Sequence, residues 1–126
     1  MATMELNQLS YNIIGCAFRV HQTLGPGLLE STYETCLCYE LEKQNLHYER
    51  QKWLDIKYND IILPNAYKID VLVENKIILE LKAVDYLQPI HTAQLLTYMK
   101  LANITIGLLI NFNTANLQHG IKRYVK

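Results

Sequence analysis

The stretch AYKIDVLVENKIILELKAV, residues 66–84, consists of two apolar arms joined by a polar centre at Glu74-Asn75-Lys76. Ile, Val and Leu dominate both arms, and these residues suit a pleated, half-buried surface. The stretch therefore predicts a β-hairpin. Side chains alternate between the faces of a strand, so the second arm should place Ile78, Glu80 and Lys82 on one face and Ile77, Leu79, Leu81 and Ala83 on the other.

The register of this hairpin brings acidic residues together. In the first arm we expect Lys68, Asp70 and Leu72 on one face and Ile69, Val71 and Val73 on the other. With Asn75 at the centre of the turn, Asp70 lies opposite Glu80 and Lys68 opposite Lys82. Opposed residues have Cβ atoms about 4.5–5.5 Å apart, where like charges repel. A divalent cation between the carboxylates would offset that repulsion. The alternative is a charged strand surface on which the acids pair with the lysines.

Length and composition describe a globular chain. We expect residues 1–126 to form one domain, because half of the residues are apolar and under a fifth are charged. The formal net charge is zero, which argues against strong nucleic-acid binding through bulk electrostatics alone. An odd cysteine count (Cys16, Cys36 and Cys38) and no evident signal peptide favour a cytoplasmic protein with reduced thiols. No apolar run is long enough to span a membrane.

Periodicity along the chain predicts a mixed architecture. Apolar residues recur at helical spacing in residues 5–22 and 28–44, with a Gly25-Pro26-Gly27 break between them. Strand character follows in residues 46–58, with a short continuation at 61–63 before Pro64. After the hairpin, Pro89 is well placed to begin a helix that ends near Ala102. The remaining expected elements are a buried strand at residues 104–112, a loop at 111–120 and an edge strand at 121–125.

This order predicts an α/β (α+β) fold with a central mixed β-sheet. A hairpin followed by a helical crossover to a buried strand predicts a sheet with both parallel and antiparallel pairs and with helices on its faces.

Three groups of residues are candidates for a functional site. Asp70, Glu80 and Lys82 on the hairpin are the first, because two carboxylates and backbone oxygens suit Mg²⁺ or Mn²⁺. Glu30, in the first turn of the second helix, is another candidate. The alternative is a structural role, because a carboxylate near a helix N-terminus interacts favourably with the helix dipole. Gln94 and Tyr98 lie four residues apart on the helix after the hairpin, one turn beyond His91, and the alternative for them is a packing interface. We interpret Arg50-Gln51-Lys52 and Lys122-Arg123 as solvated basic surface.

Several motifs resemble one known family. Gly27-Leu28-Leu29-Glu30-Ser31-Thr32-Tyr33 is similar to the G-x-x-E-x-x-Y signature of the GxxExxY protein family, and the segments ELKAV, PIHTAQLLTY and GLLINF resemble it as well. The resemblance extends from about Ile13 to Tyr124. That family is similar to the PD-(D/E)xK nuclease superfamily with a RecB-like QxxxY motif, which implies a restriction-endonuclease-like core in α-β-β-β-α-β order.

The resemblance also implies roles for individual residues. By position, Asp70 is the first acid, Glu80 and Lys82 form the ExK pair, and Gln94 and Tyr98 form the QxxxY pair that would support the site or bind substrate. Glu30, Asp70, Glu80 and the backbone carbonyl of Leu81 are the implied metal ligands. The chain departs from the pattern in two places, since Ile69 rather than proline precedes Asp70 and Lys68 replaces a more usual arginine.

Three hypotheses follow. In the first, the chain is a Mg²⁺- or Mn²⁺-dependent nuclease that hydrolyses phosphodiester bonds of DNA or, as an alternative, of RNA. Because so small a protein has little surface with which to choose a substrate, we also expect a homodimer or a partner protein. In the second, it is a non-catalytic nucleic-acid- or protein-binding module that retains the nuclease fold. In the third, the charged hairpin is ordinary surface, and replacing Asp70 by Asn would be nearly neutral.

Overall fold

The structure is a computed structural model that describes residues 5–126. Its elements in chain order are α1 (Leu6–Leu24), α2 (Glu30–Lys43), β1 (Tyr48–Tyr58), β2 (Ile61–Val73), β3 (Ile77–Lys82), α3 (Pro89–Ala102), β4 (Ile106–Asn111), the 3-10 turn η1 (Leu117–Gly120) and β5 (Ile121–Val125). The strands form one sheet in the order β1-β2-β3-β4-β5. Only the β3–β4 pair among them is parallel, so the predicted mixed sheet and its element order are confirmed.

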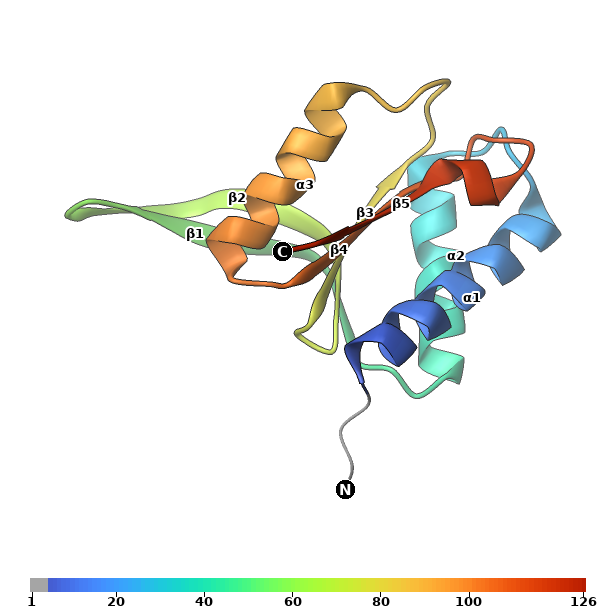
Figure 1. Cartoon of the computed structure of the whole chain (residues 1–126), viewed down its shortest axis with the longest axis horizontal. Coiled ribbons are helices and arrows are strands. Elements are labelled where there is room, and N and C mark those ends of the chain that lie inside the picture. The colour runs from blue at the N-terminus through green and yellow to red at the C-terminus, as the bar shows by residue number, and fades with distance from the viewer. Residues whose placement is uncertain (1–4) are drawn as a thin grey trace.

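The sheet separates two layers of helix. Figure 1 shows α1 and α2 together on one face and α3 on the other. Each face has its own apolar cluster. Successive residues of β3 alternate between the two clusters. Ile77, Leu79 and Leu81 pack with α1 and α2, whereas Ile78 packs with α3. The predicted faces of β3 are therefore confirmed.

The helices form where apolar spacing predicted them. In α1 the buried residues fall three or four apart at Leu9, Ile13, Cys16 and Val20, which is the stripe of a helix with one face in the core. Helix α3 begins at Pro89 as expected, and its C-cap Asn103 adopts a left-handed conformation with φ of 56° that ends the helix. No helix described within residues 5–126 is long and apolar enough to cross a membrane.

The β1–β2 hairpin is longer than predicted. Pro64 does not end a short strand, because β2 runs without a break from Ile61 to Val73. The pairing shifts between Ile56↔Leu63 and Leu54↔Tyr67, and Pro64 falls in this irregular part, where its missing N–H removes no ladder bond. The result is a two-stranded arm that projects well beyond the rest of the molecule in Figure 1.

Candidate active site

The β2–β3 ladder changes character at Asp70 and Glu80. The backbone pairs are Val73↔Ile77, Leu72↔Ile78 and Val71↔Leu79, which is the predicted register. At the next position the carboxylates bind the opposite backbone instead. Asp70 N–H donates to Glu80 Oε2 at 2.9 Å, and Leu81 N–H donates to Asp70 Oδ2 at 2.9 Å. Two carboxylates thus stand where backbone carbonyls would accept in a continuous ladder.

The two acids nevertheless do not share one regular strand face. We expected Ile69 on the face of Val71 and Val73, but Ile69 packs with Leu72 in the α3 cluster, whereas Val71 and Val73 pack on the other side. This expectation was wrong because the alternation resets between Ile69 and Val71. Gln51, on the neighbouring strand between the partners of these two residues, has a positive φ of 50°, a conformation that regular strands do not contain.

The reset places Asp70 in a cavity of about 400 Å³ beside α2. The residues that line it come from α2, β1, β2 and β3: Glu30, Ser31, Glu34, Gln51, Lys68, Asp70 and Leu81. The structure therefore brings the predicted residues Glu30, Asp70 and Leu81 to one place. The predicted acid Glu80 does not line the cavity, but its Oε2 accepts the N–H of Asp70, which does.

Glu34 is a cavity residue that the sequence analysis missed. It is buried, with 7% of its surface exposed, and it accepts hydrogen bonds from Arg50 Nε at 2.9 Å and Gln51 Nε2 at 2.5 Å. Arg50 and Gln51 are thus not simply solvated surface, as we had interpreted them. The available signal was the spacing, because Glu34 follows Glu30 by four residues and so lies on the same side of the helix.

Glu80 is the most perturbed carboxyl of the site. Only 4% of its surface is exposed, and burial, followed by the neighbouring Asp70 carboxylate, raises the pKa of Glu80 to about 8. Burial likewise raises the pKa of Asp70, although the Leu81 N–H and the Lys82 ammonium act in the opposite direction. Lys82 also lowers the pKa of Glu80, so the predicted lysine is close enough to act on both acids.

Glu30 stands at the first position of α2, where the loop before it is firmly held. Tyr33 is fully buried; its hydroxyl donates to the Gly25 carbonyl at 2.6 Å and accepts from the Leu28 N–H at 3.1 Å. Its ring stacks on Phe112 with centroids 4.6 Å apart. Tyr33 therefore links the start of α2 to the end of β4. The Glu30 charge contributes to raising the pKa of both Asp70 and Glu80.

Gln94 and Tyr98 form a pair on α3. Gln94 Nε2 donates to Tyr98 Oη at 2.9 Å, and the Tyr98 ring lies 5.0 Å from that of Tyr67. Burial and then the Glu80 charge raise the pKa of Tyr98, which places this pair on the Glu80 side of the sheet. His91 has a different role, because its Nδ1 accepts from the Gln88 N–H and caps the helix.

The carboxylate and carbonyl oxygens of the site are ligands of the kind that Mg²⁺ prefers, but they do not surround a single point as a complete coordination shell would. Within residues 5–126, no three His, Cys, Asp or Glu side chains are grouped tightly enough to hold a metal ion. Glu30, Asp70 and Leu81 nevertheless line one cavity. Mg²⁺ commonly keeps several waters and takes only one or two carboxylates, so these residues fit a hydrated ion. Burial raises the pKa of Asp70 and of Glu80 in spite of the nearby Lys82 charge, and a cation at the site would oppose that shift.

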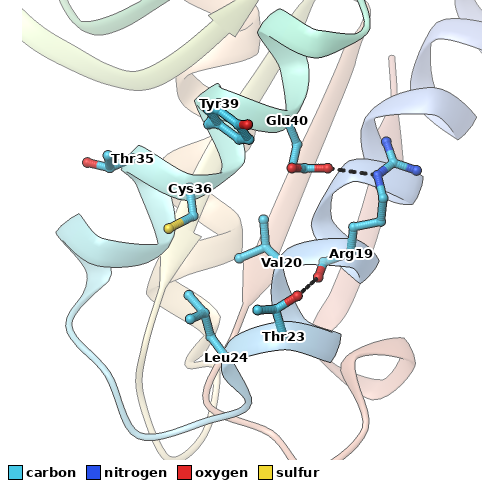
Figure 2. A pocket seen from close by; sticks show the side chains of 8 residues that line it. All are labelled: Arg19, Val20, Thr23, Leu24, Thr35, Cys36, Tyr39 and Glu40. Atoms are coloured by element: carbon cyan, nitrogen blue, oxygen red, sulfur yellow. Dashed lines mark hydrogen bonds and ion pairs between the residues drawn. The ribbon is translucent and has the colours of Figure 1, made fainter.

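A second cavity, of about 390 Å³, lies between α1 and α2 and is shown in Figure 2. Its walls are mainly apolar, with Val20, Leu24 and Cys36 among them, and an ion pair joins Arg19 Nε to Glu40 Oε1 at 2.9 Å. It has no residue in common with the cavity at Asp70. We take it as a cleft between two helices rather than part of the active site, because its one carboxylate is already paired.

Comparisons with known proteins agree with this architecture. The sequence of residues 7–124 matches the family model described as PD-(D/E)XK nuclease superfamily. Among solved structures, the chain is similar to one titled "Crystal structure of SSO0001", with a TM-score of 0.59 and 19% sequence identity. The match covers 95% of this chain and 62% of that one, so it supports the fold alone, a restriction-endonuclease-like core. A search of the curated proteins found no match.

Proposed function

This chain belongs to the PD-(D/E)XK nuclease superfamily, and we propose that it is a metal-dependent nuclease that hydrolyses phosphodiester bonds of DNA. Within the superfamily we assign it to the GxxExxY proteins, on the motif from Gly27 to Tyr33. The observation that carries the proposal is the break in the β2–β3 ladder. There, Asp70 and Glu80 each accept a backbone N–H from the opposite strand, beside a cavity that also holds Glu30.

Four groups would hold the ion, Mg²⁺ or Mn²⁺: the carboxylates of Glu30, Asp70 and Glu80 and the backbone carbonyl of Leu81. When bound, such an ion polarises a phosphate and lowers the pKa of a coordinated water. To serve as a ligand, Glu80 must lose the proton that its raised pKa retains at neutral pH. A cation at the site would favour that loss by its charge.

Lys82 would provide the positive charge of the protein itself. Its ammonium acts on both carboxyls, and it would stabilise the negative charge that develops on the phosphate in the transition state. Gln94 and Tyr98, joined by their hydrogen bond, would support Glu80 from the α3 side or contact the DNA strand.

The proposal includes a setting for the reaction. The three free cysteines, two of them buried, are typical of a reducing compartment, so we place the protein in the cytoplasm. A chain of 126 residues offers little surface for choosing a substrate beyond the site itself. We therefore include a homodimer or a partner protein in the proposal.

A second candidate is a nucleic-acid- or protein-binding module that retains the nuclease fold without cleaving. Two features favour it: burial raises the pKa of Glu80 to about 8, and the acids of residues 5–126 form no closed metal cage. The two candidates differ in whether the acids are needed for cleavage.

The deciding experiment is a cleavage assay on single-stranded and duplex DNA with Mg²⁺ or Mn²⁺, using D70N, E80Q and K82A. We expect each substitution to reduce cleavage by about 100-fold or more, and the exposed E42Q to leave it unchanged. Circular dichroism verifies that every variant is folded. If D70N, E80Q and K82A cleave as well as the parent protein, the activity belongs to a contaminant. Metal-independent DNA binding without any cleavage would favour the binding module.

A further inference from the structure

Trp53, the one tryptophan in the sequence, lies on β1 in an unusual environment. It is 54% exposed and belongs to neither apolar cluster of the sheet. Tryptophan normally contributes through the large apolar area that it buries, whereas more than half of this residue is exposed. The β1–β2 arm on which it stands projects from the body of the molecule in Figure 1.

The ring borders the proposed active site. Trp53 is paired across the strands with Lys68, and the Lys68 ammonium lies over the ring, 5.3 Å from its centroid. Lys68 also lines the cavity that contains Asp70. Asp70 follows Lys68 by two residues on β2, a distance of about 7 Å along a strand. An exposed aromatic ring and the Lys68 ammonium thus lie on neighbouring strands, two residues along β2 from the proposed metal ligand Asp70.

This combination fits a nucleic-acid strand whose bases are unpaired. Stacking on an aromatic ring accepts any base and does not depend on a strongly basic protein, and a nearby cation can contact the phosphate. Independence from overall protein charge matters here, because the net charge of the chain is zero and bulk attraction to DNA is therefore weak. In a duplex, the neighbouring base pairs already cover the faces of each base.

We propose that Trp53 is a stacking platform for an unpaired base, and that single-stranded or frayed DNA is therefore the substrate class of the adjacent site. That this DNA is a substrate rests on the nuclease function proposed above, whereas its binding to Trp53 does not.

The test uses Trp53 itself as the reporter, since its emission has no other tryptophan source. The full chain is titrated in EDTA, so that no cleavage occurs, with a single-stranded oligodeoxynucleotide of about 15 nucleotides and with relaxed closed circular duplex DNA at the same nucleotide concentration, which has no ends that fray. We expect the single strand to quench the emission and the duplex to leave it nearly unchanged. In fluorescence anisotropy with a labelled oligonucleotide, W53A should weaken single-strand binding roughly 5- to 100-fold.

Two further variants separate stacking from general effects. W53F should retain most of the affinity because it keeps an aromatic face, whereas Y11A, which removes a 73% exposed ring on α1, should bind as the parent does. Thermal melting verifies that the variants are folded. Equal quenching by the duplex, or unchanged single-strand affinity in W53A, would overturn the platform. So would an emission change that depends on protein concentration without DNA, because it would show a second copy covering the ring.

The two proposals fail separately. If D70N and E80Q abolish cleavage while Trp53 does not respond to the single strand, the nuclease assignment stands and the platform is wrong. If the single strand quenches Trp53 emission but the parent protein cleaves no DNA, the stacking platform is correct and the chain is a binding module.

Discussion

At the scale of single residues, the site depends on where two carboxyls are held. Asp70 and Glu80 are fixed to each other's strands by backbone N–H donors, so neither can relieve the repulsion by turning to solvent at no cost. Burial of Glu80, and after it the charge of the Asp70 carboxylate, raises the pKa of Glu80 to about 8, whereas the hydrogen bond from the Asp70 N–H lowers it. A cation would relieve the repulsion while leaving both acids charged.

The first prediction concerns pH. Glu80 has an ordinary pKa of 4.5 when unfolded and about 8 when folded, so the native state binds the extra proton between these values. The contribution of Glu80 to the free energy of unfolding is therefore fully present below pH 4.5 and is lost as the pH rises to about 8. In EDTA we expect the melting temperature to fall by about 10 °C from pH 5 to pH 8, as measured by circular dichroism.

The matched variants for this measurement are E80Q and E42Q. The amide of E80Q keeps an oxygen acceptor for the Asp70 N–H but cannot ionise, so its melting temperature should depend less on pH than that of the parent. E42Q changes an exposed glutamate and should follow the parent curve. A parent protein as stable at pH 8 as at pH 5 would contradict the buried, protonated state of Glu80.

At the scale of elements, the approach of α3 to the sheet depends on one glycine. A Cβ at Gly107 on β4 would lie 2.6 Å from Met99 Sδ and 2.8 Å from Leu95 Cδ1, both of them fully buried on α3. Strand β4 can therefore pack this closely beneath α3 only where residue 107 has no side chain. The position of α3 matters for the proposed function because this helix carries Gln94 and Tyr98, which we propose support the site.

The second prediction is a pair of glycine substitutions. G107A should destabilise the protein by roughly 1–3 kcal/mol, because the added methyl overpacks the α3 interface. G15A, in the middle of α1, should instead stabilise it by about 0.5–1 kcal/mol, since the nearest atom to its new Cβ is Arg19 Nη1 at 3.8 Å. Urea unfolding measures both changes. Equal effects of the two substitutions would show that α3 is not held by close packing at Gly107.

At the scale of the whole molecule, a bound ion would join separate layers. Glu30 stands on α2, Asp70 on β2 and Glu80 on β3, so an ion held by all three would bind the native state and not the unfolded chain. Ligands of this kind raise stability in proportion to the logarithm of their free concentration.

The third prediction is therefore thermal stabilisation by metal. At pH 8, Mn²⁺ or Mg²⁺ should raise the melting temperature, with a gain of about 2.7 kcal/mol at 100 times the dissociation constant. Binding should tighten between pH 6 and pH 8 because Glu80 must lose its proton. E30Q should weaken the effect and E42Q should not. If neither ion changes the melting temperature at any pH, the metal site is wrong, even where DNA binding persists.

The sequence by itself determined most of the architecture. Helical spacing of apolar residues defined α1 and α2, the position of Pro89 marked the start of α3, and the symmetry of the hairpin about Asn75 determined the β2–β3 register. These features are local, since each depends on residues that are neighbours along one helix or across one turn.

Only the tertiary structure decided how the site is shaped. The reset of the β2 faces at Asp70 lies beside Gln51 of another strand, which has a positive φ. The buried Glu34 is held by hydrogen bonds from Arg50 and Gln51, which reach α2 from β1. Such contacts join residues far apart in the chain, and alternation along one strand carries no information about them. For the same reason, the sequence placed Asp70 and Glu80 opposite each other, but the packed layers decided that Asp70 lines the cavity whereas the buried Glu80 does not.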